Sequence, residues 1–279
     1  MRKRSSLPAA VLAAAGFLLI PGAASAEAAA GPWVDAGKAR IRLVAEGIDV
    51  SGRLVAGLEI ALDPGWHTYW RSPGDSGIAP AIDFSGSRNL GPVEVAFPLP
   101  ERLDDGDLVT NVYTGNVVLP LSAKLTDPAA GADLLLKLDI GVCADVCVPD
   151  HFEATLTVRP GERDSAVGKE IAEARKRLPG APEPGAFVVT GATRQSGTDK
   201  RPTFDVAATL PRVNGAEVFV EGPDDWYPNV PKLVSDDGGK ATYRVTFDRL
   251  TSKVPIAGTK LRVTIVSAGR AIEQWVALD

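Results

Sequence analysis

The stretch ADLLLKLDIGVCADVCVPDHFEATLTV, residues 132–158, decides how the first half of this chain folds. An apolar run over residues 134–140 leads into a close pair of cysteines, and a run over residues 152–158 that alternates apolar and polar side chains leads away from it. Alternation with a period of two residues is typical of a β-strand with one buried face. The stretch therefore predicts two strands that meet at the cysteines.

Cys143 and Cys147 are the only cysteines in the 279 residues. Four residues of extended chain span about 13 Å, whereas a disulfide requires Cα atoms within about 7 Å, so the chain must turn between them. The simplest arrangement joins two strands through a tight loop, Ala144-Asp145-Val146, with the sulfur atoms facing each other across it. One turn of helix would also bring the thiols close enough.

The cysteine pair has two ordinary interpretations, a structural disulfide and a redox-active dithiol. A disulfide that closes so short a loop contributes only about 2 kcal/mol in the chain-entropy model. A chain of this length can bury a core without such a cross-link, which favours a redox role. An isolated pair in an exported protein is also often structural, so the spacing leaves both interpretations open.

Metal binding is a third interpretation. Cys143, Cys147 and His151 are each four residues apart, so they would lie on one face of a helix. Two thiolates and an imidazole suit Cu(I) or Zn²⁺. Pro149 disfavours the helix that this arrangement needs.

The first 26 residues have the pattern of a secretory signal peptide. Basic residues at positions 2–4 precede an apolar segment over residues 7–20, and the small residues Ala24-Ser25-Ala26 follow it. This order is typical of a cleaved signal, and the apolar segment is too short for a membrane span. We therefore expect cleavage near Ala26 and a soluble mature protein in a bacterial periplasm, where disulfides persist.

The charge balance argues against a nucleic-acid partner. Removal of the three basic residues at positions 2–4 would leave 27 of the 30 basic residues against 35 acidic ones, a net charge of about −8. Proteins that bind nucleic acids carry basic patches.

The periodic segments predict two β-sandwiches. Segments with strand character cover residues 39–44, 54–62, 117–125, 132–140 and 152–158, and a second series covers residues 203–208, 216–221, 241–247, 260–266 and 271–278. Between the two series, residues 165–178 predict a solvated linker helix capped by Asp164 or Ser165, and a Pro/Gly linker follows over residues 179–185. We expect the domains to cover residues 33–160 and 186–279, with the helix and linker over residues 161–185.

Four motifs then occur in a familiar order: GWHTYWRSPGDSG over residues 65–77, FPLP over residues 97–100, Tyr113 followed by LPL over residues 119–121, and GVCADVCVP over residues 141–149. Together they resemble the N-terminal periplasmic region of the DsbD/ScsB family of thiol:disulfide interchange proteins. The form WHTYWR is similar to the ScsB-like branch, which is linked to copper tolerance. The resemblance covers residues 33–160, and the second half carries no matching motif.

This resemblance implies that the first domain is an immunoglobulin-like sandwich with a redox-active pair, Cys143 and Cys147. The second series of strands predicts another all-β domain, so we expect an all-β chain of two immunoglobulin-like sandwich domains. The protein would be a thiol–disulfide oxidoreductase that needs no bound cofactor. In the family, such a domain takes electrons from a membrane-embedded domain and passes them to periplasmic thioredoxin-like oxidoreductases. The membrane and thioredoxin-like domains have no counterpart in this sequence, so we expect a separate membrane protein as the electron donor.

The resemblance also implies residues that flank the pair. His67 and Tyr69 occupy the positions of aromatic residues beside the cysteines, and Cys147 is expected to be the interchange cysteine. A cap loop that shields the disulfide in the family matches residues 103–108, which include Asp104 and Asp105 but no aromatic side chain. We therefore expect Leu108 or Tyr113 to take the shielding role.

Two other functions remain open at this point. The chain could be a non-enzymatic binding or adaptor protein with a structural disulfide, or a periplasmic copper-binding protein that uses Cys143, Cys147 and His151. Exposure of the sulfur atoms separates the first of these from a redox role, because a redox pair must be reachable by the sulfur of a partner.

Overall fold

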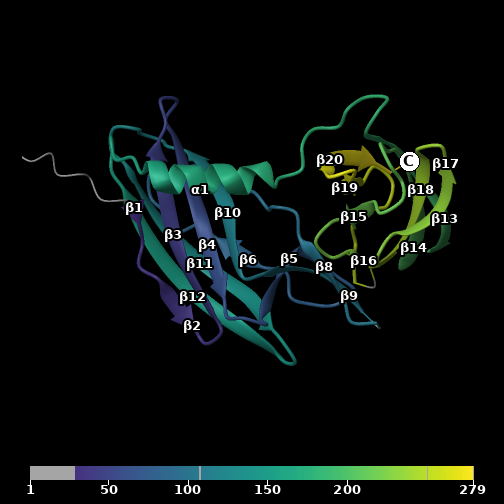
Figure 1. Ribbon diagram of the computed structural model, residues 1–279, viewed down its shortest axis with the longest axis horizontal. Coiled ribbons are helices and arrows are strands. Elements are labelled where there is room, and N and C mark those ends of the chain that lie inside the picture. The colour runs from purple at the N-terminus through teal and green to yellow at the C-terminus, as the bar shows by residue number, and fades with distance from the viewer. Residues whose placement is uncertain (1–28, 107, 250, 279) are drawn as a thin grey trace, which may run out of the picture.

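The computed structural model describes residues 29–106, 108–249 and 251–278. The expected signal peptide, residues 1–26, lies outside this part of the chain. Apart from one helix, the regular structure of the described residues is all β-strand, so the predicted all-β class is confirmed. Figure 1 shows two bodies, one formed by β1 to β12 with the helix α1 and the other by β13 to β20. Among the described residues, no helix has the length and apolar character needed to cross a membrane.

The first body is a sandwich of two antiparallel sheets. One sheet has the order β1-β3-β4-β10-β7 with β2 beside β3, and the other has the order β12-β11-β5-β9-β8 with β6 beside β11. The strands are β1 (Ala29–Ala30), β2 (Val34–Ala36), β3 (Ala39–Ile48), β4 (Arg53–Leu62), β5 (His67–Gly74), β6 (Ala81–Asp83), β7 (Glu94–Val95), β8 (Glu101–Asp104), β9 (Val109–Thr114), β10 (Asn116–Lys124), β11 (Ala132–Cys143) and β12 (Cys147–Val158).

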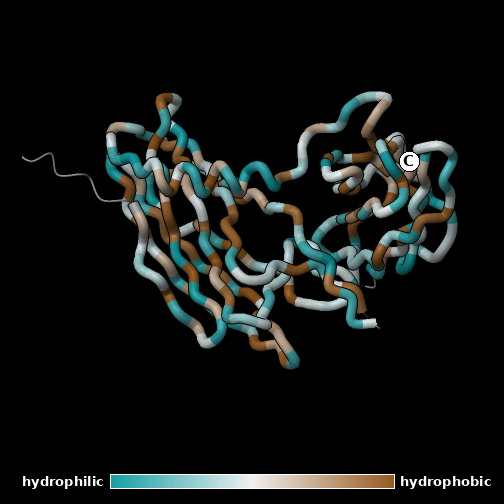
Figure 2. Tube along the Cα trace, in the orientation of Figure 1, coloured by the Kyte–Doolittle hydropathy of each residue, from teal (hydrophilic) through white to brown (hydrophobic). Residues whose placement is uncertain are grey.

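The core of the first sandwich follows from the period of two residues along these strands. Leu134, Leu136 and Leu138 of β11 are buried between the sheets, as is Phe152 of β12, while the residues between them are mostly turned to the outer face. Figure 2 shows hydrophobic and hydrophilic residues alternating along these strands. Burial of the apolar face is what stabilises such a sandwich in water.

The hairpin predicted at the cysteines is confirmed. β11 and β12 pair from Ala132 opposite Val158 to Cys143 opposite Cys147. The backbone N–H of Ala144 donates a hydrogen bond to the carbonyl of Val146 at 3.1 Å, which closes the loop. The helical turn that the spacing also allowed does not form.

The helix α1 (Ser165–Lys176) begins where the sequence predicts and ends two residues earlier. The Asp164 carboxylate accepts hydrogen bonds from the backbone N–H groups of Ala166 and Val167, as expected of an N-cap. The expectation of a solvated linker helix is wrong, because Val167 and Ile171 are buried against Val44 on the outer face of the first sandwich. The helix is therefore part of the first body.

The second body is also built from two antiparallel sheets. Their orders are β13-β14-β18-β16, with β17 beside β18, and β15-β19-β20. The strands are β13 (Val188–Thr198), β14 (Arg201–Thr209), β15 (Glu217–Glu221), β16 (Tyr227–Pro228), β17 (Lys232–Asp237), β18 (Lys240–Asp248), β19 (Lys260–Ser267) and β20 (Arg270–Ala277). Phe204, Trp226 and Phe247 pack together in its own core. The domain bounds given above stay predictions.

Candidate redox site at the disulfide

The cysteine pair lies at the end of the β11–β12 hairpin, in a row of residues that crosses the sheet. Cys147 is opposite Cys143, Cys143 is opposite His67 of β5, and His67 is opposite Thr114 of β9. Cys143 and Cys147 form a disulfide with a Cα–Cα distance of 4.1 Å. Side chains directly opposite each other share a face of the sheet, and this row occupies the outer face, since the even-numbered residues of β11 face the core.

The two cysteine residues differ in exposure. Cys143 is 1% exposed, whereas Cys147 is classed with the exposed residues beside it. Val146 in the loop is 63% exposed, and Ile78, which packs over Gly141, is 41% exposed. We call Ile78 and Val146 the apolar rim. Cys147 is therefore the cysteine at the surface, while Cys143 is covered.

Tyr69 of β5 is the polar neighbour of both sulfur atoms. Its hydroxyl lies 3.2 Å from Cys143 Sγ and 3.4 Å from Cys147 Sγ. Burial raises the pKa of Tyr69, so its hydroxyl remains protonated near neutral pH and can donate a hydrogen bond. Tyr69, Val112 and Cys143 form a small buried cluster separate from the main core.

Two glycines leave room for the Tyr69 ring. A Cβ atom on Gly141 would lie 3.2 Å from Cε2 of the ring, and one on Gly77 would lie 2.3 Å from Cε1. Gly77 also has a φ of +119°, a conformation that side-chain-bearing residues rarely adopt. The packing of these glycines against Tyr69 could not be read from the sequence.

His67 stands beside this cluster. Its ring contacts that of Tyr69 edge to face, with 5.5 Å between the ring centroids. Burial lowers the pKa of His67, so the imidazole is neutral near pH 7. The resemblance therefore pointed to two residues, His67 and Tyr69, that the structure does bring to the disulfide.

Residues 103–108, the predicted cap loop, border the redox site through a residue other than the expected ones. Leu103 of β8 lines a hollow of about 340 Å³ together with His67, Ala144 and Asp145. Asp104 follows Leu103 and so points to the other face of the hairpin, where its carboxylate accepts a hydrogen bond from the N–H of Gly106. The leucine that borders the site is thus Leu103.

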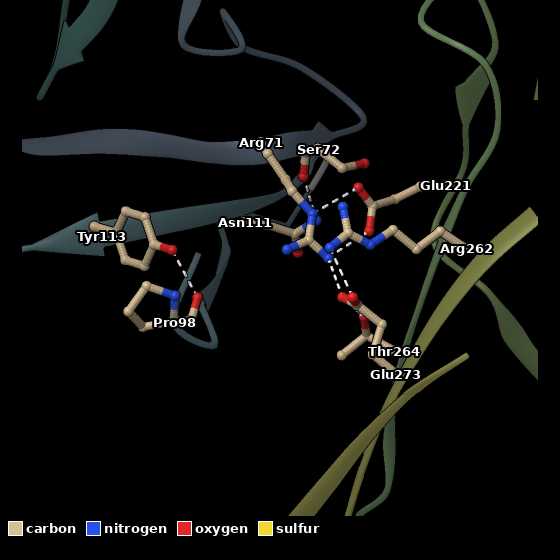
Figure 3. Close-up of polar contacts among 9 residues, drawn as sticks. All are labelled: Arg71, Ser72, Pro98, Asn111, Tyr113, Glu221, Arg262, Thr264 and Glu273. Carbon is tan, nitrogen blue, oxygen red and sulfur yellow. Dashed lines mark hydrogen bonds and ion pairs between the residues drawn. The ribbon is translucent and has the colours of Figure 1, made fainter. Parts of the chain in front are cut away.

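Leu108 and Tyr113 do not shield the disulfide in this structure. Leu108 lies in the turn between β8 and β9, where its N–H donates a hydrogen bond to Asp105. Tyr113 belongs to the core of the sandwich, on the opposite face of β9 from Val112. Its hydroxyl donates a 2.6 Å hydrogen bond to the carbonyl of Pro98 (Figure 3), and burial raises its pKa.

The structure separates His151 from the cysteines. His151 lies four residues along β12 from Cys147, about 13 Å in an extended strand, and its Nδ1 is 2.7 Å from a carboxylate oxygen of Asp139. Within the described ranges, no group of three or more His, Cys, Asp or Glu residues could hold a metal ion. This fold therefore does not bring Cys143, Cys147 and His151 together as one group of ligands.

Comparisons with known proteins agree with this geometry. Residues 45–158 match the family model for the N-terminal part of thiol:disulfide interchange protein DsbD. A crystal structure of the N-terminal periplasmic domain of ScsB from Proteus mirabilis is similar in fold, with a TM-score of 0.68 and 21% sequence identity. The alignment covers 90% of this chain and 99% of that one, so the likeness extends over both sandwiches. A search of the curated proteins found no match.

The matched segment contains both cysteines, His67 and Tyr69, and it adopts the expected sandwich. Thiol–disulfide interchange is thus the chemistry of the family to which the site belongs. Residues 45–158 of this chain form an N-terminal domain of the DsbD family of thiol:disulfide interchange proteins.

Proposed function

We propose that this protein is a periplasmic electron relay that passes reducing equivalents to thioredoxin-like partner proteins through Cys143 and Cys147. The observation that carries the proposal is the asymmetry of the pair, with Cys147 exposed, Cys143 buried and the Tyr69 hydroxyl beside both sulfur atoms. An accessible sulfur next to a covered one is what sequential attack and resolution require.

In the reducing half of the cycle, a thiolate of the electron donor attacks Cys147 Sγ. The new donor–Cys147 bond forms as the Cys143–Cys147 bond breaks, and its electron pair passes to Cys143 Sγ. The second thiolate of the donor then displaces Cys147, so that the donor leaves oxidised and the pair is reduced by two electrons. We expect the donor to be a separate membrane protein.

In the oxidising half, the Cys147 thiolate attacks a disulfide of the acceptor. The acceptor releases one sulfur as a thiolate and remains bound to Cys147. Cys143 then attacks Cys147 Sγ, which restores the Cys143–Cys147 bond and frees the acceptor as a dithiol. These exchange steps conserve both atoms and electrons, and they need no cofactor.

Tyr69 supports this cycle by donating a hydrogen bond to Cys143 Sγ when that atom carries charge. A buried thiolate without a donor would be costly, because burial disfavours charge. The 3.2 Å distance and the raised pKa of Tyr69 place a protonated hydroxyl where the charge develops. Hydrogen bonds to charged groups are the stronger class, at about 1.5–3 kcal/mol.

The apolar rim supports a protein partner. Val146 adjoins Cys147 in the chain and Ile78 packs over Gly141, and a partner that covers these exposed side chains removes apolar surface from water. A location in the periplasm fits the sequence pattern of residues 1–26, and the solved ScsB domain is named as periplasmic. These observations favour a relay between proteins in an oxidising compartment.

The experiment that tests the proposal is a titration of the Cys143–Cys147 pair with glutathione redox buffers, combined with trapping. We expect a reduction potential between about −180 and −270 mV, the range of known exchange proteins. Cys143→Ser should then accumulate a mixed disulfide with a thioredoxin-like protein, whereas Cys147→Ser should not. A potential below about −300 mV and no trapped complex would instead support a structural disulfide in a binding or adaptor protein.

A further inference from the structure

We propose that the second sandwich is a positioning platform for the redox site. Phe219, Glu221 and Glu273 hold the part of β5 that follows Tyr69, and they thereby set where the Tyr69 hydroxyl lies against the sulfur atoms. This inference rests on the proposed function, since it gives the second sandwich a part in thiol exchange at the first.

The first observation is that β5 loses its regular pairing directly after Tyr69. Tyr69 lies opposite Val112, but the next ladder pair is Gly74 opposite Thr110, so residues 70–73 bulge against Asn111. The Asn111 amide donates one hydrogen bond of 2.8 Å to the carbonyl of Ser72. Backbone pairing therefore holds β5 at Tyr69 and again at Gly74, and it leaves residues 70–73 without regular ladder partners.

Arg71, in the middle of the bulge, is bound by the second sandwich. Its guanidinium donates two hydrogen bonds to Glu221, at 2.9 and 2.8 Å, and one to Glu273 at 2.5 Å (Figure 3). Glu273 also accepts hydrogen bonds from Arg262 at 2.6 Å and from Thr264 at 3.1 Å. We call Arg71 and its two carboxylate partners, Glu221 and Glu273, the clamp. Arg71 follows Tyr69 by two residues in β5, so the clamp lies close to Tyr69 along the strand.

This clamp is largely withdrawn from water. The Arg71 side chain is 10% exposed. Burial opposes the charge of Arg71, but the hydrogen bonds and charge of Glu221 raise its pKa above the usual value. Burial likewise works to raise the pKa of Glu273, but Arg262 and Arg71 lower it. Removal of one partner of such a pair leaves an uncompensated buried charge, so each carboxylate restrains Arg71 strongly.

An apolar contact reinforces the clamp. Phe219 of the second sandwich is 3% exposed and is buried in the core of the first. Its ring contacts Trp70 edge to face at 5.3 Å between centroids, and the Arg102 guanidinium lies 4.7 Å from the centroid of the Phe219 ring. Trp70 and Arg71, the two residues after Tyr69, are thus both held by the second body.

The chain that leaves the bulge returns to the Tyr69 ring. The N–H of Asp75 donates to the carbonyl of Val109, and the N–H of Val109 donates to the Asp75 carboxylate. Gly77 then packs on the Tyr69 ring. Residues 71–77 also line a cleft of about 550 Å³ whose other wall includes Glu221 and Tyr227 of the second sandwich. The segment that packs on the ring therefore follows, within a few residues, the part of β5 that contacts the second body.

The test compares the rate constants for reduction of the disulfide by dithiothreitol. Glu221→Gln combined with Glu273→Gln removes the charges that hold Arg71. The matched control is Asp205→Asn, which breaks the paired hydrogen bonds of 2.8 and 2.9 Å from Arg244 within the second sandwich. We expect reduction about three- to tenfold slower in the double variant, the size of coupling between contacting groups, and no change in the control.

A double-mutant cycle separates positioning from general loosening. If the clamp acts through the Tyr69 hydroxyl, the double variant should have little further effect in a Tyr69→Phe background, which already lacks that hydroxyl. Equal slowing in both backgrounds, or an unchanged rate in the double variant, would overturn the inference. Phe219→Leu is also measured in the wild-type and Tyr69→Phe backgrounds. If the double variant fails to fold, the effect of Phe219→Leu in the two backgrounds tests the inference instead.

Failure of the proposed function gives a different result. If the wild-type protein has a structural disulfide, its potential lies below the exchange range and its mixed disulfides are not trapped, whatever the second sandwich does. If the wild type exchanges normally and the cycle shows no coupling, only the positioning role is lost.

Discussion

Tyr69 is a polar side chain that contacts both sulfur atoms of the disulfide. It is buried between Gly77 and Gly141, and its hydroxyl is within hydrogen-bond distance of both sulfur atoms. The glycines give the ring its place because any Cβ atom there would contact it. The rate of exchange should therefore depend strongly on one atom, the hydroxyl oxygen of Tyr69.

Tyr69→Phe removes only the hydroxyl. We expect reduction of the disulfide to slow by about tenfold or more, because a hydrogen bond to a charged group contributes about 1.5–3 kcal/mol. The measurement is the rate of reduction by dithiothreitol near neutral pH. Tyr227→Phe, at an exposed tyrosine of the second sandwich, is the matched control. An unchanged rate in Tyr69→Phe would show that the hydroxyl does not stabilise the leaving sulfur.

His67 should make stability depend on pH. Burial lowers its pKa in the folded state, so between the folded and unfolded pKa values the unfolded chain binds more protons. The free energy of unfolding should therefore fall as the pH decreases below about 6.5, the unperturbed value. Urea unfolding at pH 7 and pH 5 measures this change. His67→Gln should reduce this change, and an undiminished change in His67→Gln would show that another group causes it.

At the scale of the element, backbone pairing along the β11–β12 hairpin places the cysteines opposite each other. The strands are paired along their whole length, and the core-facing residues, such as Leu138 and Phe152, fix their register. A shift by one residue would turn these side chains to the outer face. The hairpin is therefore a rigid support on which the sulfur–sulfur bond can open and close.

Reduction of the disulfide should consequently leave the fold intact. We expect the free energy of unfolding to fall by about 2 kcal/mol or less, since the closed loop is short. Urea unfolding of the oxidised and phosphine-reduced protein measures the difference. The near-ultraviolet circular dichroism, which reports on the buried Trp70 and Trp226, should stay the same. Loss of that signal on reduction would mean that the disulfide is a structural requirement.

At the scale of the whole molecule, the two sandwiches share an interface around the β5 bulge, while Cys147 and the apolar rim face outward. Small thiols need only reach the sulfur, but a protein partner must also cover the surface around it. The same disulfide can therefore respond differently to a small reductant and to a protein.

Val146→Asp tests the partner surface. A charge in the centre of a contact is costly to desolvate, so we expect exchange with a thioredoxin-like protein to slow by about tenfold. Reduction by dithiothreitol should change much less. Thr155→Asp places the same charge at an exposed position further along β12 and is the control. Equal slowing with both reductants would indicate a change at the disulfide itself.

The sequence by itself determined the local features of this protein. The period of two residues over 132–140 and 152–158 gave the hairpin, the chain turned at Ala144-Asp145-Val146 as the disulfide geometry requires, and Asp164 capped the helix. The motifs around His67, Tyr69 and the cysteines indicated the family. These inferences succeed because they depend on neighbours in the chain and on residue type.

Only the tertiary structure decided which of these residues meet. Tyr113 faces the core and Leu103 the hollow, because the pleat of β8 and β9 is set by pairing that no local pattern reveals. The buried face of α1 and the Arg71 clamp depend on surfaces more than a hundred residues apart in sequence. Contacts of this kind arise when separate sheets and helices pack to exclude water, and a sequence pattern specifies the faces that pack without naming their partners.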